Sequence, residues 1–147
     1  MKIYVGSDHN GFELKQELFA YLSRNNYDVE DVGDKQLDPE DDFPQFAAIA
    51  ATKILGSTDQ DPRAILICGS GQGMAMAANR FKGIRASVVW DVEEAKITRN
   101  DNDSNVLCLP SRILKEDETN AIVKAWLETP FAGATRYIRR NRQMDDI

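Results

Sequence analysis

The segment with the strongest chemical signal reads Cys68-Gly69-Ser70-Gly71-Gln72-Gly73, with three glycines in five positions directly after a thiol. Glycines at this density let backbone N–H groups converge on an anion, and a helix N-terminus lowers the pKa of a nearby thiol from about 8.5. The segment has neither the lysine of a P-loop nor the GxGxxG spacing of a dinucleotide site. Two interpretations stay open: an anion-binding turn with a reactive Cys68, or a tight structural turn with a buried thiol.

The only histidine of the chain, His9, follows Asp8 at the end of an apolar segment, residues 2–6, that is typical of a strand. A lone histidine is more often structural than functional. Its position at a strand end, rather than on an apolar helix face, nevertheless favours a role in binding or catalysis.

A third candidate is a basic cluster near the end of the chain. Arg136 and Arg140 are spaced i, i+4, so they would lie on one face of a helix. In an acidic chain, a local basic cluster suggests an anionic ligand. A solvated basic tail is the alternative.

The composition argues against several classes of protein. The chain has 18 Lys and Arg against 24 Asp and Glu, a net charge of −6, so we expect no binding to nucleic acid. No apolar run approaches the roughly 18 residues that cross a bilayer, so we expect no membrane contact. The N-terminus lacks the apolar core of a signal peptide, which predicts a cytoplasmic protein with free thiols.

One histidine and two cysteines 40 positions apart do not make a metal-binding cluster, so we expect neither a metal nor another cofactor. Cys108 lies within an apolar segment and is predicted to be part of the core. The acidic run at residues 38–42 is predicted to be a solvated loop.

The candidates must be positioned by a fold, and the hydrophobic pattern predicts one. The 147 residues suit one domain, residues 1–147. Predicted strands alternate with predicted helices, which is typical of an α/β, three-layer αβα sandwich with a five-stranded parallel Rossmann-like sheet and a C-terminal helical arm at 130–147. The strands are expected at 2–6, 27–33, 64–68, 84–90 and 105–109, and helices at 44–55, 73–81, 92–99 and 118–128 and on the face formed by Leu14, Leu18, Tyr21 and Leu22.

In such sheets ligands bind outside the carboxyl ends of the strands. Asp8-His9, the glycine-rich segment, Trp90-Asp91 and Pro110-Ser111-Arg112 all follow predicted strands. We therefore expect the functional site at this edge, although the pattern leaves the strand order open.

Taken together, these motifs resemble those of the type B ribose-5-phosphate isomerases and the related galactose-6-phosphate isomerase subunits, over nearly the whole chain. The segments that carry the resemblance are Gly6-Ser7-Asp8-His9-Asn10-Gly11-Phe12-Glu13-Leu14-Lys15, Cys68-Gly69-Ser70-Gly71-Gln72-Gly73-Met74, Ala78-Asn79-Arg80, Gly83-Ile84-Arg85-Ala86, Asn102-Asp103-Ser104-Asn105-Val106-Leu107, and Arg136-Tyr137 with Arg139-Arg140.

The resemblance implies a metal-independent aldose–ketose isomerase that interconverts ribose 5-phosphate and ribulose 5-phosphate, a reaction of the pentose phosphate pathway. Cys68 would move a proton between C2 and C1 through an enediolate. The amides of the turn, from Gly69 through Gly71 to Gly73, would stabilise that enediolate, and Ser70 would pass protons between its oxygens. No cofactor is implied.

The resemblance also assigns the binding residues. His9 and Arg112 would bind the phosphate, and Arg136 and Arg140 would reach it from a partner subunit. The sugar hydroxyls would be held by Asp8 and Asn102. The implied assembly is a homodimer or homotetramer with an active site shared between subunits, which the arm at 130–147 would contact.

The sequence departs from the family pattern at one catalytic position, because Asp101 stands where the family has the histidine that opens the furanose ring. Trp90 is bulky for a pocket residue, and Tyr137 replaces a frequent histidine. These departures leave two alternatives open: an isomerase of another sugar phosphate, such as allose or galactose 6-phosphate, or a sugar-phosphate-binding homologue with weak catalysis.

Overall fold

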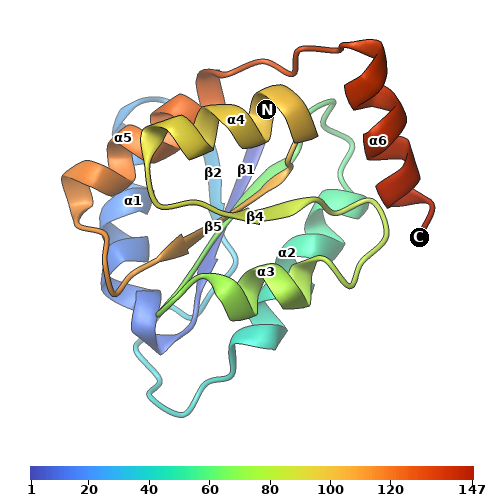
Figure 1. Ribbon diagram of the computed structural model, residues 1–147. Helices are drawn as coiled ribbons and strands as arrows, with labels where there is room; N and C mark the ends of the chain where they lie inside the picture. The colour runs from blue at the N-terminus through green and yellow to red at the C-terminus, as the bar shows by residue number, and fades with distance from the viewer.

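The computed structural model describes residues 1–147 and consists of one sheet with helices on both sides (Figure 1). The elements are β1 (Lys2–Ser7), a 3-10 turn (His9–Gly11), α1 (Phe12–Arg24), β2 (Asp28–Asp31), α2 (Phe43–Leu55), β3 (Arg63–Cys68), α3 (Gln72–Ala78), β4 (Ala86–Val88), α4 (Val92–Asn102), β5 (Val106–Pro110), α5 (Glu116–Glu128) and α6 (Thr135–Asp145). The predicted α/β class with a parallel sheet is confirmed.

The five strands pair in the order β2-β1-β3-β5-β4, and every pair is parallel. From β1 the chain first extends the sheet on one side with β2 and then crosses to β3 on the other. The point between β1 and β3 is therefore where the connections reverse, and crevices at such points are the usual ligand sites of open α/β sheets.

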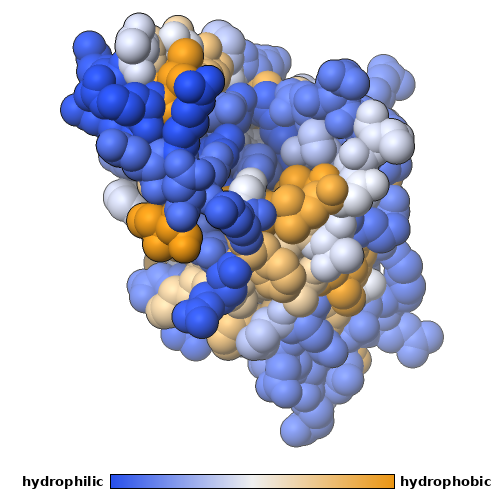
Figure 2. Space-filling view, turned by 90° about the vertical axis from the view of Figure 1, so that its right-hand side faces the viewer, coloured by the Kyte–Doolittle hydropathy of each residue, from blue (hydrophilic) through white to orange (hydrophobic).

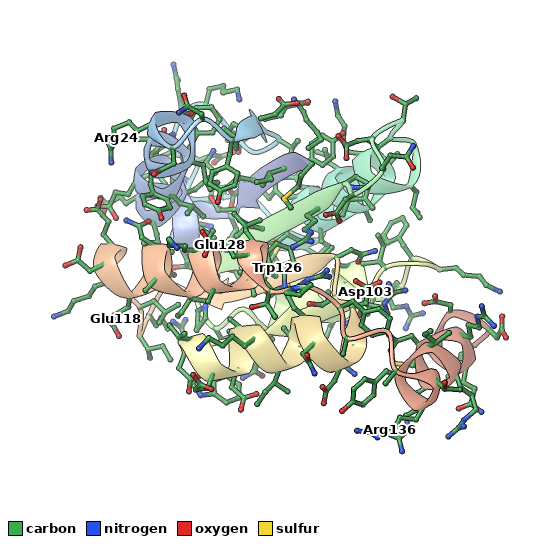
Figure 3. All side chains as sticks on the ribbon, turned by 90° about the horizontal axis from the view of Figure 1, so that it is seen from above. Arg24, Asp103, Glu118, Trp126, Glu128 and Arg136 are labelled. Atoms are coloured by element: carbon green, nitrogen blue, oxygen red, sulfur yellow. The ribbon has the colours of Figure 1, made fainter.

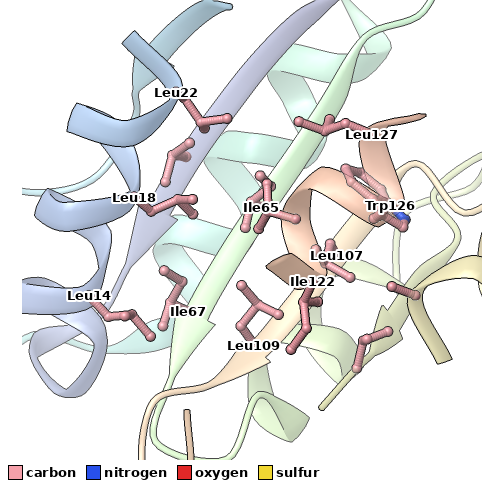
Figure 4. Close-up of a cluster of buried hydrophobic side chains, with 14 of the residues drawn as sticks. Leu14, Leu18, Leu22, Ile65, Ile67, Leu107, Leu109, Ile122, Trp126 and Leu127 are labelled. Atoms are coloured by element: carbon pink, nitrogen blue, oxygen red, sulfur yellow. The ribbon is translucent and has the colours of Figure 1, made fainter. Parts of the chain in front are cut away.

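Two hydrophobic clusters of 16 buried residues each hold the three layers together, one on either face of the sheet. On one face Leu18, Ile122 and Trp126, from α1 and α5, pack against the strands (Figure 4). On the other face Phe46 and Met74, from α2 and α3, do the same. The central strands are apolar at successive positions because both of their faces are covered.

Several boundaries differ from the sequence prediction. The strand predicted at 84–90 is limited to Ala86–Val88, and the helix predicted at 92–99 continues to Asn102. The strand β4 lies at the edge of the sheet, where the Asn79 side chain donates to Ala86 O at 2.9 Å and accepts from Ala86 N at 2.8 Å. A side chain thus takes the place of a further strand, which hydrophobic periodicity does not reveal.

The C-terminal helix α6 stands apart from the three layers (Figure 1). Its polar links to the body include an ion pair between Asp145 and Arg85, and in the linker Ala132 N donates to Asn100 O at 3.1 Å. Nearly all of its residues are exposed or half-exposed. None of the helices is both long and apolar enough to cross a membrane.

We predict that Gly11→Ala destabilises the fold. A Cβ on Gly11 would lie 2.7 Å from Ile67 O and 2.8 Å from Ile67 C, so the turn after β1 or the end of β3 would have to move. The expected loss is about 1–3 kcal/mol of unfolding free energy, measured by chemical denaturation. Gly56→Ala is the control, because Gly56 has a φ of −93° and its added Cβ would meet only Thr52 O, at 3.3 Å. Equal stability of the two variants would contradict this account of the turn.

Candidate active site

Three loops meet at the carboxyl ends of β1, β3 and β5. Asp8 N donates to Ile67 O at 3.3 Å, and Ser111 N donates to Cys68 O at 2.9 Å. The Ser111 hydroxyl closes the group by donating to Asn10 O at 2.9 Å. These hydrogen bonds bring the ends of three strands, separated by up to 101 positions in the sequence, into one surface.

The Cys68 thiol lies at the mouth of the glycine-rich turn. The residue is 5% exposed, and its Sγ accepts a hydrogen bond from Gly71 N at 3.2 Å. Gly71 has a φ of +74°, a left-handed conformation that favours glycine. The backbone N–H groups of Gly69 and Ser70 donate to no group of the chain.

The other thiol differs in its surroundings. Cys108 lies within β5, is fully buried, and its pKa is raised by that burial and, to a smaller extent, by the proximity of Cys68. Because only a thiolate is a strong nucleophile or base, Cys108 is chemically inert. Its predicted place in the core is confirmed.

Two further glycines of the turn allow close contacts that any side chain would block. A Cβ on Gly69 would lie 3.0 Å from Arg112 Nε, and one on Gly73 would lie 2.8 Å from the Phe43 ring. Arg112 is also held by its backbone N–H, which donates to Gly69 O at 3.1 Å. The predicted phosphate ligand Arg112 is therefore beside the turn.

A cleft of about 310 Å³ opens at this place. Ser70 is exposed there, and its hydroxyl accepts from Gln72 N at 3.3 Å. The lining residues are Gly69, Ser70, Gln72, Val88, Trp90, Pro110, Arg112 and Ile113. A larger hollow of about 630 Å³ lies against the outer side of α2 and contains none of the predicted site residues.

His9 has a partner that the sequence analysis missed. Asp41 Oδ1 accepts from His9 N at 2.9 Å and lies 2.7 Å from His9 Nδ1. This hydrogen bond is the largest cause of the raised pKa of His9, and the charge of Asp8 adds to it. The Asp41 side chain is only 3% exposed, so the prediction of a solvated loop at 38–42 is wrong at this residue. The sequence around Asp41 gives no indication of a contact with His9, which lies 32 positions away.

Asp8 is buried, and one of its two carboxylate oxygens already accepts hydrogen bonds within the chain. Its Oδ1 accepts from Asn10 N at 3.0 Å and from Gly11 N at 3.3 Å, which caps the short 3-10 turn. Oδ2 is left to contact a hydroxyl group. The structure thus gives Asp8 a structural role in addition to the predicted binding role.

Four predicted site residues lie elsewhere in the chain's own fold. Asp101 and Asn102 are in the last turn of α4, just before β5 begins, and Arg136 and Arg140 are on α6. The amino end of the sheet is separated from the carboxyl end by five residue steps of β3, about 17 Å. One chain therefore does not bring all the predicted residues into one site.

Arg85 connects the end of α4, which carries Asp101 and Asn102, to α6, which carries Arg136 and Arg140. Its Nε donates to Asn102 O at 3.0 Å, its terminal nitrogens contact Asp103, and it pairs with Asp145 of α6 at 2.9 Å. Asp103 and Arg136 lie on the same side of the molecule (Figure 3). We call Asp101, Asn102, Arg136 and Arg140 the amino-edge set, and the residues around Cys68 the carboxyl-edge set (Asp8, His9, Cys68, Gly69, Ser70, Gly71, Gly73, Arg112).

Figure 2 looks onto the side of the molecule where α6 lies, and this surface is mostly hydrophilic with separate hydrophobic patches. A cleft of about 830 Å³ on the amino side is lined by residues that include Asn102, Arg85 and Asp145. No group of three or more His, Cys, Asp and Glu side chains lies close enough together to hold a metal ion.

Comparison with known proteins points to one family of enzymes. Residues 3–144 match a family model described as ribose/galactose isomerase. The chain is 39% identical over 140 residues to ribose-5-phosphate isomerase B of Mycolicibacterium paratuberculosis, which covers 95% of this chain and 87% of that protein.

Two solved structures are similar in fold and sequence. A ribose 5-phosphate isomerase from Thermotoga maritima has a TM-score of 0.94 at 38% identity, covering 99% of this chain and 98% of that one. Ribose-5-phosphate isomerase B from Mycoplasma genitalium, solved with bound ribulose 5-phosphate, has a TM-score of 0.93 at 36% identity and covers 99% and 94%.

We predict that a thiol reagent such as iodoacetamide distinguishes the two cysteines of the native protein. Cys68 should be alkylated, whereas Cys108 should stay unmodified because its raised pKa and complete burial keep it protonated and out of contact with solvent. Peptide mass spectrometry measures both sites, and the unfolded protein, in which both react, is the control. Alkylation of Cys108 at the same rate as Cys68 would contradict the assignment.

Proposed function

The chain belongs to the ribose/galactose isomerase family and is a sugar-phosphate isomerase; we propose that its reaction is the interconversion of ribose 5-phosphate and ribulose 5-phosphate. The observation that carries the proposal is the Cys68 thiol beside free backbone amides at the point where the sheet connections reverse. The binding of ribulose 5-phosphate by the M. genitalium enzyme, similar over 99% of this chain, supports the choice of substrate.

In the proposed mechanism Cys68 acts as the base. Its thiolate removes the proton from C2 of the open-chain aldose, which leaves an enediolate, and the resulting thiol returns the proton to C1. The free amides of Gly69 and Ser70 stabilise the negative oxygen, as in an oxyanion hole. The Ser70 hydroxyl transfers protons between the two oxygens. All steps are proton transfers, so the proposed route uses no metal.

We infer that each active site combines two chains. The carboxyl-edge set supplies the base and the phosphate ligands His9 and Arg112. The amino-edge set of a second copy supplies Arg136 and Arg140 for the phosphate, with Asn102 at the hydroxyls. The separation of about 17 Å between the two ends of β3 supports this division, because one chain cannot span it. A homodimer is the smallest assembly with complete sites, and a homotetramer would contain two such pairs.

Asp101 favours a second candidate function, the isomerisation of a six-carbon sugar phosphate. A carboxylate is a weaker base at neutral pH than the imidazole found at this position in the family, so Asp101 is poorly suited to opening a furanose ring. Its oxygens are instead suited to accept hydrogen bonds from the hydroxyls of another sugar. Assays with ribose, allose and galactose phosphates test the choice, and ribose 5-phosphate should give the highest kcat/KM. Binding without turnover of any of them would indicate a non-catalytic homologue.

We predict that Cys68→Ala lowers kcat by at least about a thousandfold while binding of the sugar phosphate is retained. The base acts in the transition state, whereas the phosphate ligands contact substrate throughout the reaction. Steady-state kinetics and calorimetric binding separate the two effects. Cys108→Ala is the matched control and should keep its kcat. Near-normal turnover by Cys68→Ala would remove the thiol from the mechanism.

We predict that Arg136→Ala and Arg140→Ala each raise KM about tenfold with a smaller change in kcat, because a phosphate contact is made in both ground and transition states. Mixing either variant with Cys68→Ala should restore activity, since a mixed dimer keeps one intact site. At substrate concentrations well below KM, where the arginine variant alone is weakly active, random exchange of equal amounts would give about a quarter of the wild-type activity. No recovery, with subunit exchange verified by mass spectrometry, would indicate that each site is built within one chain.

We predict that Asp101→His raises kcat/KM for ribose 5-phosphate at least about tenfold, because an imidazole accepts and donates protons near neutral pH. Erythrose 4-phosphate is the control substrate, since its esterified C4 oxygen cannot close a furanose ring and its turnover should not change. No gain with ribose 5-phosphate, or an equal gain with both substrates, would mean that Asp101 does not limit ring opening. The six-carbon alternative would then be preferred.

A further inference from the structure

The contact between Asp41 and His9 is the shortest link between the acidic loop and the carboxyl-edge set. One carboxylate oxygen, Asp41 Oδ1, receives both the backbone N–H of His9, at 2.9 Å, and the ring nitrogen Nδ1, at 2.7 Å. The Asp41 side chain is 3% exposed and that of His9 is 34% exposed. The carboxylate is thus buried behind a ring that remains open to solvent.

The loop that carries Asp41 is held at both of its ends. At its start the buried Lys15 donates to Asp34 O at 2.7 Å and to both oxygens of Asp31, at 2.9 and 3.0 Å. At its end the ring of Phe43, two residues after Asp41, packs against Gly73 of the glycine-rich turn. The loop is therefore held by contacts other than the one between Asp41 and His9.

The geometry determines which ring nitrogen of His9 carries a proton. A carboxylate only accepts, so Nδ1 must be the donor to Asp41. In the neutral ring Nε2 then carries no proton and cannot donate to an anion. It becomes a donor only when the ring is charged.

We propose that Asp41 is a positioning residue that orients the His9 ring and maintains Nε2–H as a hydrogen-bond donor toward the phosphate of the substrate. This inference rests on the proposed function only in assigning His9 to the phosphate. The charged groups that act on the ring are Asp41, which dominates, and Asp8, and both carboxylates raise the pKa of His9. The cationic ring is thereby retained to higher pH than in a free histidine.

Nuclear magnetic resonance tests the inference directly, because the chain has one histidine and every imidazole signal belongs to His9. Titration of the ¹⁵N-labelled wild type should show Nδ1 protonated in the neutral ring. In Asp41→Asn, whose amide oxygen still accepts, the titration midpoint should fall because the charge is lost. Glu40→Gln is the matched control, since it removes one charge from an exposed neighbour in the same loop and should leave the midpoint unchanged.

Binding of inorganic phosphate provides the functional readout. Between the two titration midpoints His9 is charged in the wild type and neutral in Asp41→Asn, so the variant should bind phosphate about tenfold more weakly. Below both midpoints the affinities should be equal. In the isomerase assay the same pH range should show a raised KM with little change in kcat, a pattern that a general loss of stability would not produce.

Three results would overturn the inference: a neutral wild-type ring protonated at Nε2, an unchanged midpoint in Asp41→Asn, or a lowered midpoint with unchanged phosphate affinity. The first needs no variant, so the test stands even if Asp41→Asn folds poorly. Failure of the proposed function is distinguishable, because the wild type would then not isomerise ribose 5-phosphate while the His9 titration and phosphate binding still followed the expected pattern.

Discussion

The parallel pairing of β1 with β3 is the constraint on which the rest of the structure depends. Five residue pairs place the end of β1 beside the end of β3, so Asp8 and His9 lie next to Cys68. Gly11 makes this approach possible, because a side chain at this position of the turn after β1 would collide with Ile67. The same parallel direction puts all amino ends of the strands at the opposite edge. The two sets of candidate residues are therefore apart in one chain.

Within the carboxyl-edge set, backbone groups and small residues do much of the positioning. The turn after β3 places Gly71 N on Cys68 Sγ, and its other two glycines let Arg112 and Phe43 approach it closely. The loop before α2 contributes twice, through Asp41 on His9 and through Phe43 on the turn. The sheet thus carries short loops that stabilise one another, which keeps the candidate site residues in place without a large enclosed pocket.

The amino-edge set is organised by buried or half-buried arginines. Arg85 joins the end of α4 to α6, and Arg99 pairs with Asp103 at 2.9 Å. Burial and the charge of Arg63 lower the pKa of Arg99, and the carboxylate of Asp103 offsets part of that effect. The left-handed conformation of Asp103 ends α4, which leaves Asp101 and Asn102 in its last turn. The ion pair between Arg85 and Asp145 thus links α6 to the end of α4.

The sequence by itself determined the fold class, the number of strands and the carboxyl-edge residues, because apolar periodicity and glycine spacing are local properties. It also identified Arg136 and Arg140 as one face of a helix. Only the tertiary structure decided the strand order, the contact of Asp41 with His9, the caps formed by Asn79 and Asp8, and the placement of Asp101 and Asn102 away from Cys68. These features depend on which distant segments meet, and that is set by the sheet order and the packing of the layers, which no local pattern records.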